Sequence, residues 1–556
     1  MERVWLKEYP SGVPAEIDPD QYASLKALIE QCLVQYAERN AFVQMGRTLT
    51  YAEVDRLSLA FAGWLHSQGL KQGDRIALMM PNLLQYPIAM FGALRAGLTV
   101  VNTNPLYTAE ELRHQLIDSG ASTIVVLENF CSVLQQVIEQ TQVRHVITTL
   151  VGEMLGFPKR TIVDFVVRNV RKQVPAWRIK GARSFSDVLA EGANTSLRDV
   201  DVGAGDVAFL QYTGGTTGIA KGAMLTHRNM VANALQCKAW HEQVPIDHAT
   251  YFIALPLYHI FSLTANCLLY TLVGGFGVMV PNPRDFPAFI KELQRHPPNI
   301  LNGVNTLFNA LMNTPGFEKV DFSKMVATVG GGMAVQAVVA EKWLKMTRCP
   351  LTQGWGLTET SPVAAVNKLV NEPFTGSIGL PLPSTEISIR DDAGKDLGLD
   401  AVGEICVRGP QVMRGYWQRD DETALVMLPD GFIRTGDIGR MDARGYVFIE
   451  DRKKDMITVS GFKVYPNEVE GVAAQHPKVF EAAAIGVPDE RSGEAVALYV
   501  VPKDPSVTKE EIIAFMRKSL TSYKVPHQVH FRKSLPKTNV GKILRRALRE
   551  SEDGAS

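Results

Sequence analysis

The sequence predicts an α/β protein with a large N-terminal body, built of two α/β layered sheets and a small β subdomain, and a small α+β domain at its C-terminal end. Three observations predict this class. Up to about residue 450, strand-sized apolar runs alternate with helix-length amphipathic stretches, which is typical of layered sheets. From about residue 375 to 450 the pattern changes to short strands separated by turns. After residue 450, a fully charged run (451–455) precedes a separate compact pattern.

The elements follow in order along the chain. Helical patterns over 51–68 and 109–119 flank apolar runs at 75–80 and 123–127, and another strand-sized run lies at 253–255. Such runs indicate buried, parallel strands. Residues 385–414 read as short strands split by turn pairs, and 509–520 as a helix of the last domain. We therefore divide the chain into residues 1–450, with a β-rich subdomain at about 375–450, and residues 451–556. The charged run is expected to be a solvated connector.

Composition excludes several classes of function. The 556 residues carry 58 basic and 58 acidic side chains, so no bulk charge attracts nucleic acid. Hydrophobic content of 46% and charged content of 21% are ordinary for a globular protein. The six cysteines are scattered and form no zinc-site or disulfide pattern, which fits a reducing compartment. The first residues lack the apolar core of a signal peptide, and we expect a cytoplasmic protein.

Two segments raise the question of a membrane. Residues 249–283 are long and apolar enough to span a bilayer, but Pro256, His259, Asn266 and a glycine cluster divide them into core-sized pieces. We expect core, with a span as the alternative. Residues 159–180 have seven basic side chains against Asp164, a net charge of +6, with apolar residues at helical spacing. This insert is either a helix at an anionic membrane surface or a cover helix with an ordinary polar side.

The strongest local motif is the glycine-rich run over residues 212–222, Tyr-Thr-Gly-Gly-Thr-Thr-Gly-Ile-Ala-Lys-Gly. Glycines let backbone N–H groups approach an anion closely, threonine hydroxyls add donors, and Lys221 adds charge. This chemistry suits a polyphosphate. The run is not a Walker A loop, because Ala220 precedes the lysine and Gly222 follows it. It also lacks the dinucleotide-binding G-x-G-x-x-G pattern.

This run resembles the signature of the adenylate-forming (AMP-binding) enzymes, and further motifs resemble the same family in the same order over nearly the whole chain. They are Gln353-Gly354-Trp355-Gly356-Leu357-Thr358-Glu359-Thr360, Arg434-Thr435-Gly436-Asp437, Pro256-Leu257-Tyr258-His259, and Pro536-Lys537-Thr538-Asn539-Val540-Gly541-Lys542. Within the family, the chain is most similar to the bacterial long-chain fatty acyl-CoA synthetases. The resemblance implies Mg²⁺ as cofactor and ATP, CoA and a long-chain fatty acid as substrates.

The resemblance also implies roles for individual residues. Lys542, His259 and Glu359 are the expected catalytic residues, and Thr213 and Glu359 the expected magnesium ligands. Trp355 offers a flat face for adenine, and Asp437 an acceptor for the ribose hydroxyls. The expected ATP-binding residues are Thr213, Gly214, Gly215, Thr216, Thr217, Gly218, Lys221, Gly331, Gln353, Gly354, Trp355, Gly356, Thr358, Asp437, Arg452 and Lys454. The expected acyl- and CoA-binding residues are His259, Phe261, Leu263, Asn305, Gly331, Met333, Gly461 and Lys463.

The expected reaction is formation of an acyl-adenylate, followed by attack of the CoA thiol, with the C-terminal domain turning about Asp451 between the two steps. The residues expected to line the acyl tunnel are assigned from the resemblance alone, and the residue that gates the tunnel is not identified. A medium-chain or other acyl-CoA ligase and a fatty acyl-AMP ligase that serves a carrier protein stay open. A nucleotide-binding membrane protein is the non-enzyme alternative. The expected partners are the substrates fatty acid, ATP and CoA. Peripheral contact with an anionic membrane through residues 159–180 is left open, and so is a homodimer.

Overall fold

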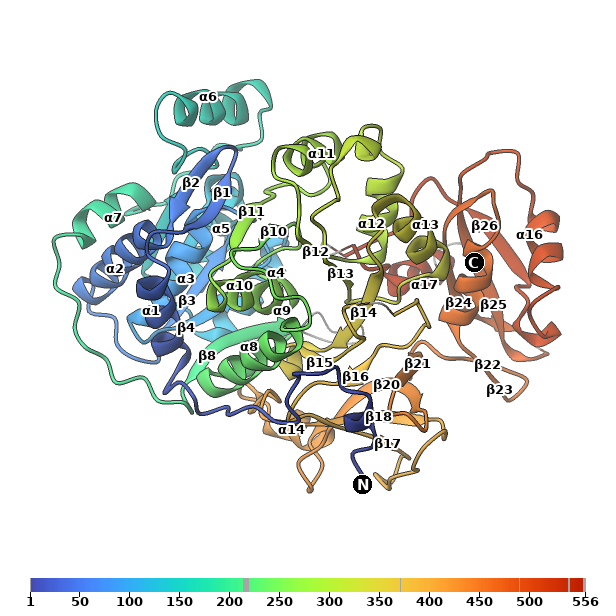
Figure 1. Cartoon of the computed structure of the whole chain (residues 1–556). Coiled ribbons are helices and arrows are strands. Elements are labelled where there is room, and N and C mark those ends of the chain that lie inside the picture. The colour runs from blue at the N-terminus through green and yellow to red at the C-terminus, as the bar shows by residue number, and fades with distance from the viewer. Residues whose placement is uncertain (1, 214–219, 371, 490, 539–540, 554–556) are drawn as a thin grey trace.

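The computed structural model describes residues 2–213, 220–370, 372–489, 491–538 and 541–553, whose strands form four sheets (Figure 1). Two large sheets and one small one make up the body, and the fourth belongs to the C-terminal domain. The predicted α/β class with these parts is confirmed.

The first large sheet is parallel at its centre and antiparallel at one edge. Its order is β19-β9-β8-β4-β3-β5-β6-β7, with β8 antiparallel to β9 and β9 antiparallel to β19. Two helices with clear N-terminal signals, α2 (Tyr51–Ser67) and α4 (Ala109–Ser119), precede β3 and β5 of this sheet; Thr50 with Glu53, and Thr108 with Glu111, form their capping boxes. The strands are β3 (Arg75–Met79), β4 (Thr99–Asn102), β5 (Thr123–Leu127), β6 (His145–Thr149), β7 (Arg183–Ser184), β8 (Val207–Thr213), β9 (Lys221–Thr226) and β19 (Gly415–Tyr416).

The second large sheet has the order β16-β15-β14-β13-β12-β10-β11-β1-β2, and its central strands, from β14 to β1, are parallel. The apolar segment 249–283 contributes β10, β11 and short helices to this half of the body. Its interpretation as core holds, and no helix in the described part of the chain is long and apolar enough to cross a membrane. The strands are β1 (Asn40–Gln44), β2 (Arg47–Thr50), β10 (Thr250–Ile253), β11 (Phe276–Met279), β12 (Ile300–Gly303), β13 (Ala327–Gly330), β14 (Leu351–Gly356), β15 (Val363–Val366) and β16 (Leu380–Pro381).

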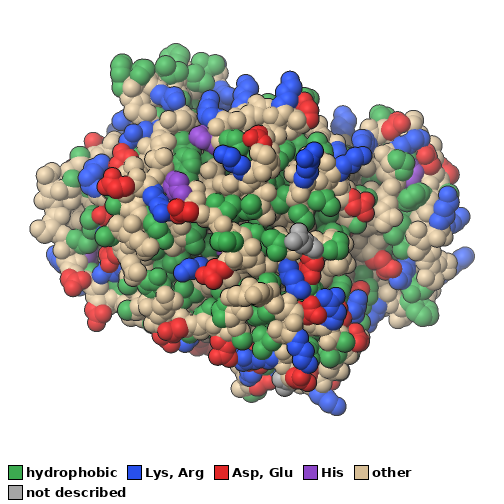
Figure 2. Space-filling model, viewed as in Figure 1, with side chains coloured by type: hydrophobic (Ala, Val, Ile, Leu, Met, Phe, Trp, Pro, Cys, Tyr) green, Lys and Arg blue, Asp and Glu red, His purple; other side chains and the backbone are tan. Residues whose placement is uncertain are grey.

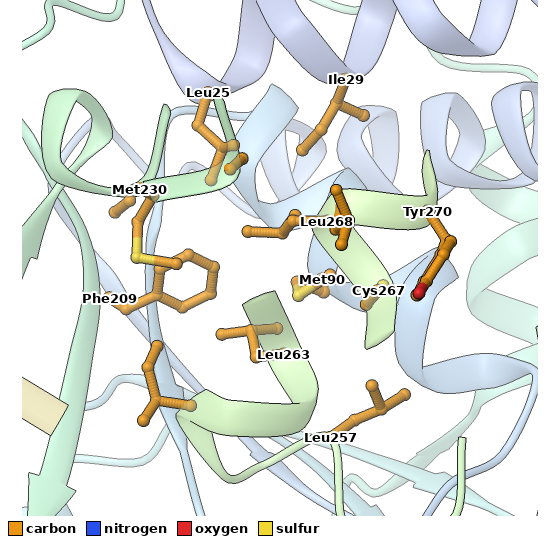
Figure 3. Packing of buried hydrophobic residues seen from close by; sticks show 14 of the residues in the cluster. Leu25, Ile29, Met90, Phe209, Met230, Leu257, Leu263, Cys267, Leu268 and Tyr270 are labelled. Atoms are coloured by element: carbon orange, nitrogen blue, oxygen red, sulfur yellow. The ribbon is translucent and has the colours of Figure 1, made fainter. Parts of the chain in front are cut away.

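A shared apolar core joins these sheets and the helices around them. Figure 3 shows part of this core, where Leu263 lies among Met90, Phe209 and Leu257. The body helices are α1 (Leu25–Gln35), α2 (Tyr51–Ser67), α3 (Gln85–Arg95), α4 (Ala109–Ser119), α5 (Cys131–Val137), α6 (Lys159–Phe165), α7 (Phe185–Gly192), α8 (His227–His241), α9 (Ile260–Ser262), α10 (Leu269–Leu272), α11 (Phe286–Arg295), α12 (Asn305–Met312), α13 (Ala337–Thr347) and α14 (Asp420–Val426). Val166–Val170 and Leu263–Leu268 form π-helical turns.

The small sheet of the body is antiparallel, in the order β17 (Glu386–Arg390), β18 (Gly403–Arg408), β20 (Ile433–Met441) and β21 (Val447–Arg452). The C-terminal sheet runs β23 (Phe462–Val464), β22 (Ile457–Val459), β25 (Gly493–Pro502) and β24 (Val479–Asp489), with β26 (Gln528–Phe531) beside β25. Helices α15 (Pro466–Ala474), α16 (Lys509–Met516) and α17 (Arg545–Asp553) accompany it. Its apolar clusters contain only residues beyond 456, so this part of the chain has a core of its own.

Candidate active site

A cavity of about 1500 Å³ lies where both large sheets, the small sheet and the C-terminal domain come together. Its wall includes residues at or just beyond the carboxyl ends of parallel strands, such as Asn102 of β4, Val304 after β12 and Gly331 after β13. Ligand sites of α/β proteins form at such strand ends, because loops there can diverge and leave a crevice. Lys542 of the C-terminal domain lines the same cavity.

Two polar residues of the glycine-rich run lie together in this wall. Thr213 ends β8 and Lys221 begins β9, and the antiparallel register pairs them directly. The Lys221 ammonium forms an ion pair with Glu422 and lies 5.2 Å from the centre of the Tyr416 ring. Gly214, Gly215, Thr216, Thr217 and Gly218 lie outside the described residues. The two strand ends therefore place a hydroxyl and a cation side by side at the cavity.

Glu359 stands in a short helical turn after β14, and a tyrosine fixes its carboxylate. The Tyr416 hydroxyl donates a hydrogen bond to Oε1 of Glu359 at 2.7 Å. Burial, reinforced by the nearby carboxylate, raises the pKa of Tyr416 well above its ordinary value, so the hydroxyl keeps its proton and acts as the donor. Sequence reasoning missed Tyr416, because its partner lies 57 positions away in the chain and no local pattern marks the pair.

The motif over residues 353–360, in which Trp355 is expected to bind adenine, is held in place by a second carboxylate, that of Asp437. The indole Nε1 of Trp355 donates to Asp437 Oδ2 at 2.9 Å, and Arg452 Nε lies 3.1 Å from Asp437 Oδ1. Asp437 and Arg452 are direct partners in the β20–β21 register. A side chain at Gly356 is impossible without a backbone shift, since a Cβ there would lie 1.8 Å from the Pro362 carbonyl oxygen. Gly354, Trp355, Gly356, Thr358, Arg452 and Lys454 all line the cavity.

Gln353 is an exception to the expected ATP-binding set. It is buried outside the cavity wall, where its amide donates to the Ser377 carbonyl at 3.0 Å and accepts from the Val335 backbone at 2.8 Å. These contacts tie the loop after β13 to the segment before β16. Its side chain therefore supports the shape of the site instead of lining it, contrary to the expectation.

Lys542 and His259 line the same cavity, and burial lowers the pKa of both side chains. Burial, with Arg452 next in importance, lowers the pKa of Lys542 to about 7. Burial, and then the Lys542 charge, lowers the pKa of His259 to about 4, so this imidazole is neutral at neutral pH. The Lys542 loop is joined to the body, since the Thr306 hydroxyl donates to the Gly541 carbonyl at 3.2 Å.

An apolar channel extends from this polar region along one face of the second sheet. Ile300, Asn302 and Val304 alternate along and just beyond β12, and Ala327, Val329 and Gly331 match them along β13. The opposite wall includes one face of α8 and the residues after it, at i, i+3, i+4 and i+7: Cys237, Trp240, His241 and Val244. Leu269 and Tyr270 of α10 add to this wall.

This channel differs from the expected one in most of its walls. Phe261 and Gly331 line it, and a Cβ on Gly331 would lie 3.1 Å from the Phe261 ring. Leu263 does not, because it faces the apolar core of the body (Figure 3). Asn305 accepts a hydrogen bond from the Gln336 backbone, and Met333 packs on a different apolar cluster. The α8 wall was missed because that helix is buried on nearly all sides and its sequence marks no single face.

The charged run 451–455 is only in part the solvated connector that its composition predicts, because Lys453 and Lys454 are exposed whereas Asp451 and Asp455 are buried. Asp451 is fully buried at the end of β21, and it accepts hydrogen bonds from the backbone N–H groups of Arg452 and Asn467, at 2.7 and 2.8 Å. The Arg545 guanidinium lies 3.9 Å from Asp451 and 3.3 Å from Asp455. These partners come from distant positions in the sequence, which no local pattern reveals, and they offset the desolvation of the buried carboxylates.

Two residues expected to bind CoA, Gly461 and Lys463, do not line the cavity. They are exposed at the β22–β23 turn.

Comparison with known proteins identifies the family. The chain matches the AMP-binding enzyme family over residues 29–417 and the C-terminal domain of AMP-binding enzymes over residues 468–542. It belongs to the AMP-binding enzyme family. This AMP-binding enzyme is 53% identical to the long-chain-fatty-acid–CoA ligase of Salmonella typhimurium, covering 100% of the chain and 99% of that protein. It is 54% identical to the ligase of the same name from Yersinia pestis, covering 99% and 98%.

The fold agrees with solved structures of such enzymes. The crystal structure of ATP-bound MatB from Rhodopseudomonas palustris matches with a TM-score of 0.83 at 27% identity, covering 96% of this chain and 99% of that one. The arrangement described above, with the C-terminal lysine in a cavity shared by both parts of the chain, therefore belongs to a fold in which ATP has been observed bound.

Proposed function

We propose that this AMP-binding enzyme converts a long-chain fatty acid, ATP and CoA into fatty acyl-CoA, AMP and pyrophosphate through an acyl-adenylate. The observation that carries this proposal is the shared cavity. An apolar channel opens into a polar region that holds Lys221, Glu359, Trp355 and Lys542. Full-length identity to long-chain-fatty-acid–CoA ligases supports the choice of substrate class.

In the first half-reaction, a fatty carboxylate attacks the α-phosphorus of ATP and pyrophosphate leaves. We assign Thr213 and Lys221 to the phosphates, Trp355 to adenine and Asp437 to the ribose. Both reacting groups are anionic, so the Lys542 ammonium is assigned to bridge the carboxylate and the α-phosphate and hold them in line. The neutral His259 imidazole, beside Phe261 at the mouth of the channel, is assigned to position the carboxylate.

The donors present fit Mg²⁺. Glu359 and Thr213 offer hard oxygen ligands on the cavity wall, and the Tyr416 hydrogen bond to Oε1 leaves Oε2 of Glu359 for a cation. The described residues contain no group of three or more His, Cys, Asp and Glu side chains that could hold a metal. This agrees with an ion that takes one or two protein ligands and otherwise water and substrate phosphate. Bound at these ligands, Mg²⁺ would neutralise negative charge on the leaving pyrophosphate.

In the second half-reaction, the CoA thiol attacks the acyl carbonyl and AMP leaves. We propose that the C-terminal domain (451–556) then turns about Asp451, so that Lys542 leaves and the face carrying Gly461 and Lys463 approaches the cavity. These residues are exposed at the β22–β23 turn, free to meet CoA after such a rotation.

ATP–pyrophosphate exchange across straight-chain acids of increasing length, with and without CoA, tests the function. We expect exchange with long-chain acids, and acyl-CoA when CoA is added, because each buried methylene contributes about 0.8 kcal/mol. Exchange without thioester formation would indicate an acyl-AMP ligase instead. The absence of exchange with every carboxylate would contradict the proposal.

We further propose that residues 159–180, together with Phe157 just before them, contact an anionic membrane, which places the enzyme peripherally at the cytoplasmic face of the cell membrane. A cover helix would bury its apolar face, but here Phe157, Ile162, Phe165 and Val170 are 91%, 60%, 58% and 64% exposed. They lie on the projection that carries α6, where Figure 2 shows hydrophobic side chains gathered at one end of the molecule. The basic side chains of the same insert suit anionic headgroups.

Cosedimentation with phosphatidylcholine vesicles, with and without phosphatidylglycerol, tests this contact. We expect binding that needs the anionic lipid and falls by about tenfold in a double variant, Ile162→Ser with Phe165→Ser, since both apolar contacts are lost. Val34→Ser is the control, because Val34 is at least as exposed as these residues, at 72%, but lies on α1. Equal binding of the double variant and the wild type would contradict the contact.

A further inference from the structure

The deep end of the apolar channel carries polar side chains that the proposed reaction does not use. Tyr270, His241 and Asn302 all line the cavity and are each more than nine-tenths buried. Strand pairing in the second sheet and contacts between aromatic rings place these residues in the channel. β12 pairs with β10 so that Ile300 faces Tyr251, and the Tyr251 and Tyr270 rings stack at 3.9 Å. The His241 ring meets Tyr270 edge-on at 5.7 Å.

This group is far from the reacting carboxylate. The channel runs along β12 and β13 from their carboxyl ends, near Gly331, to their amino ends, near Ile300 and Ala327. At about 3.3 Å per residue, the stretch from Ile300 to Val304 spans about 13 Å. A fatty acid with its carboxylate near Lys542 therefore brings its methyl end, not its head, to Tyr270 and His241.

The hydrogen-bonding capacity of the group is only partly used within the protein, where the Tyr270 hydroxyl interacts with the Asn302 side chain. His241 Nε2 and Asn302 Oδ1 are buried without a partner in the described part of the chain, although Asn302 Nδ2 donates to Asn266 and to the Ala265 carbonyl. Burial raises the pKa of Tyr270 and lowers that of His241, so a neutral phenol and a neutral imidazole offer both donors and acceptors. A purely apolar chain end leaves these groups unsatisfied.

We propose that this end of the channel binds a hydroxyl group at or near the methyl end of a fatty acid, so that ω-hydroxy fatty acids of one matching chain length are substrates. A hydroxyl both donates and accepts, which suits this set of neutral polar groups better than a methyl or a carboxylate does. The inference rests on the proposed function, because it assumes that the channel holds the acyl chain.

The test compares kcat/KM for ω-hydroxy and unsubstituted acids of the same length, from 10 to 18 carbons by design, in the wild type and in Tyr270→Phe. We expect one chain length at which the ω-hydroxy acid is tolerated or preferred. At that length, the ratio of kcat/KM for the ω-hydroxy acid to kcat/KM for the unsubstituted acid should fall about tenfold in Tyr270→Phe, because the variant loses a hydrogen bond to the hydroxyl. His241→Phe should lower the same ratio.

Tyr251→Phe is the matched control. The Tyr251 hydroxyl is also buried without a partner in the described chain, but Tyr251 does not line the cavity, so its removal should leave the ratio unchanged. A wild-type enzyme that rejects the ω-hydroxyl at every length, or an equal ratio in wild type and Tyr270→Phe, overturns the inference. Failure of the proposed function is distinguishable, because unsubstituted acids would then give no acyl-CoA either.

Discussion

At the scale of single residues, the site depends on titratable side chains whose pKa values are shifted by burial. Lys542 is the clearest case, because desolvation is the largest cause of the fall in its pKa to about 7. A lysine in water stays charged at every physiological pH, whereas this one changes charge near neutrality. The proposed bridge between two anions needs the charged form, which makes the first half-reaction sensitive to pH.

We expect kcat/KM for adenylation to fall as the pH rises through about 7, because the free enzyme then loses the Lys542 proton. Bound ATP and carboxylate favour the ammonium, so kcat should hold to higher pH. Lys542→Ala should abolish adenylation but leave thioester formation from supplied acyl-adenylate largely intact. In Lys542→Arg, kcat/KM for any residual adenylation should no longer fall as the pH rises through about 7, since the guanidinium stays charged. If kcat/KM falls in the same way in this variant, a group other than residue 542 causes the pH dependence.

Tyr416 gives a second prediction at this scale. Tyr416→Phe leaves Oε1 of Glu359 without its donor, so the carboxylate is less well placed for a cation. We expect the Mg²⁺ concentration for half-maximal adenylation to rise about tenfold, with partial rescue of the rate by excess Mg²⁺. Tyr446→Phe removes a similar tyrosine–glutamate hydrogen bond, to Glu372, away from the cavity and should leave the Mg²⁺ dependence unchanged.

At the scale of elements, α17 secures the last domain around a buried charge cluster. Arg545, its first residue, donates to Glu470 at 2.8 Å and to Asn467 at 2.9 Å, and also lies close to Asp451 and Asp455. Because Arg545 follows Lys542 by three positions, this cluster also fixes where the Lys542 loop leaves the domain.

Arg545→Gln should destabilise the C-terminal domain by about 3 kcal/mol or more, because it leaves buried carboxylates without their cation. Urea denaturation, or the rate of limited proteolysis within the domain, measures this loss. The matched control is Arg546→Gln. Arg546 is exposed and pairs with Glu550 on the same helix, so its loss should cost less than about 0.5 kcal/mol. Equal effects of the two substitutions would show that the cluster contributes nothing particular.

The elements also show what the sequence can and cannot predict. Periodicity and turn residues were sufficient for strands such as β5 and helices such as α4, whose predicted bounds agree with the structure. Most of the described motif residues of the phosphate and adenine regions line one cavity, because strand pairing such as Thr213 with Lys221 brings them together, whereas Gln353 and Asp437 lie behind its wall. Of the residues expected to bind the acyl chain, His259, Phe261 and Gly331 line the cavity, but Leu263, Asn305 and Met333 do not. The channel wall on α8 is set by tertiary packing, and Leu263 gives no local sign of whether it faces core or channel.

At the scale of the whole molecule, the buried Asp451 constrains the rotation that we propose for the last domain. Contacts next to the pivot move least, so the hydrogen bond from the Asn467 backbone can survive a rotation about residue 451. Contacts farther away, such as those of Thr306 with Gly541 and of Lys453 with Asp392, must break. A hinge of this kind needs only a few residues at an element's end to change their backbone angles.

Asp451→Pro should therefore separate the two half-reactions. Proline fixes φ at this position, and the edge strand β21 is a place where a sheet tolerates it. With Lys542 held in the cavity, ATP–pyrophosphate exchange should stay within about threefold of the wild type, because the first step needs no rotation. Thioester formation from supplied acyl-adenylate should fall by at least about a hundredfold, because Gly461 and Lys463 cannot reach the cavity. Asp451→Asn, which removes the buried charge without fixing the backbone, separates loss of rotation from loss of the carboxylate. If Asp451→Pro lowers both half-reactions equally, or Asp451→Asn reproduces its pattern, rotation about residue 451 is not what links the two steps.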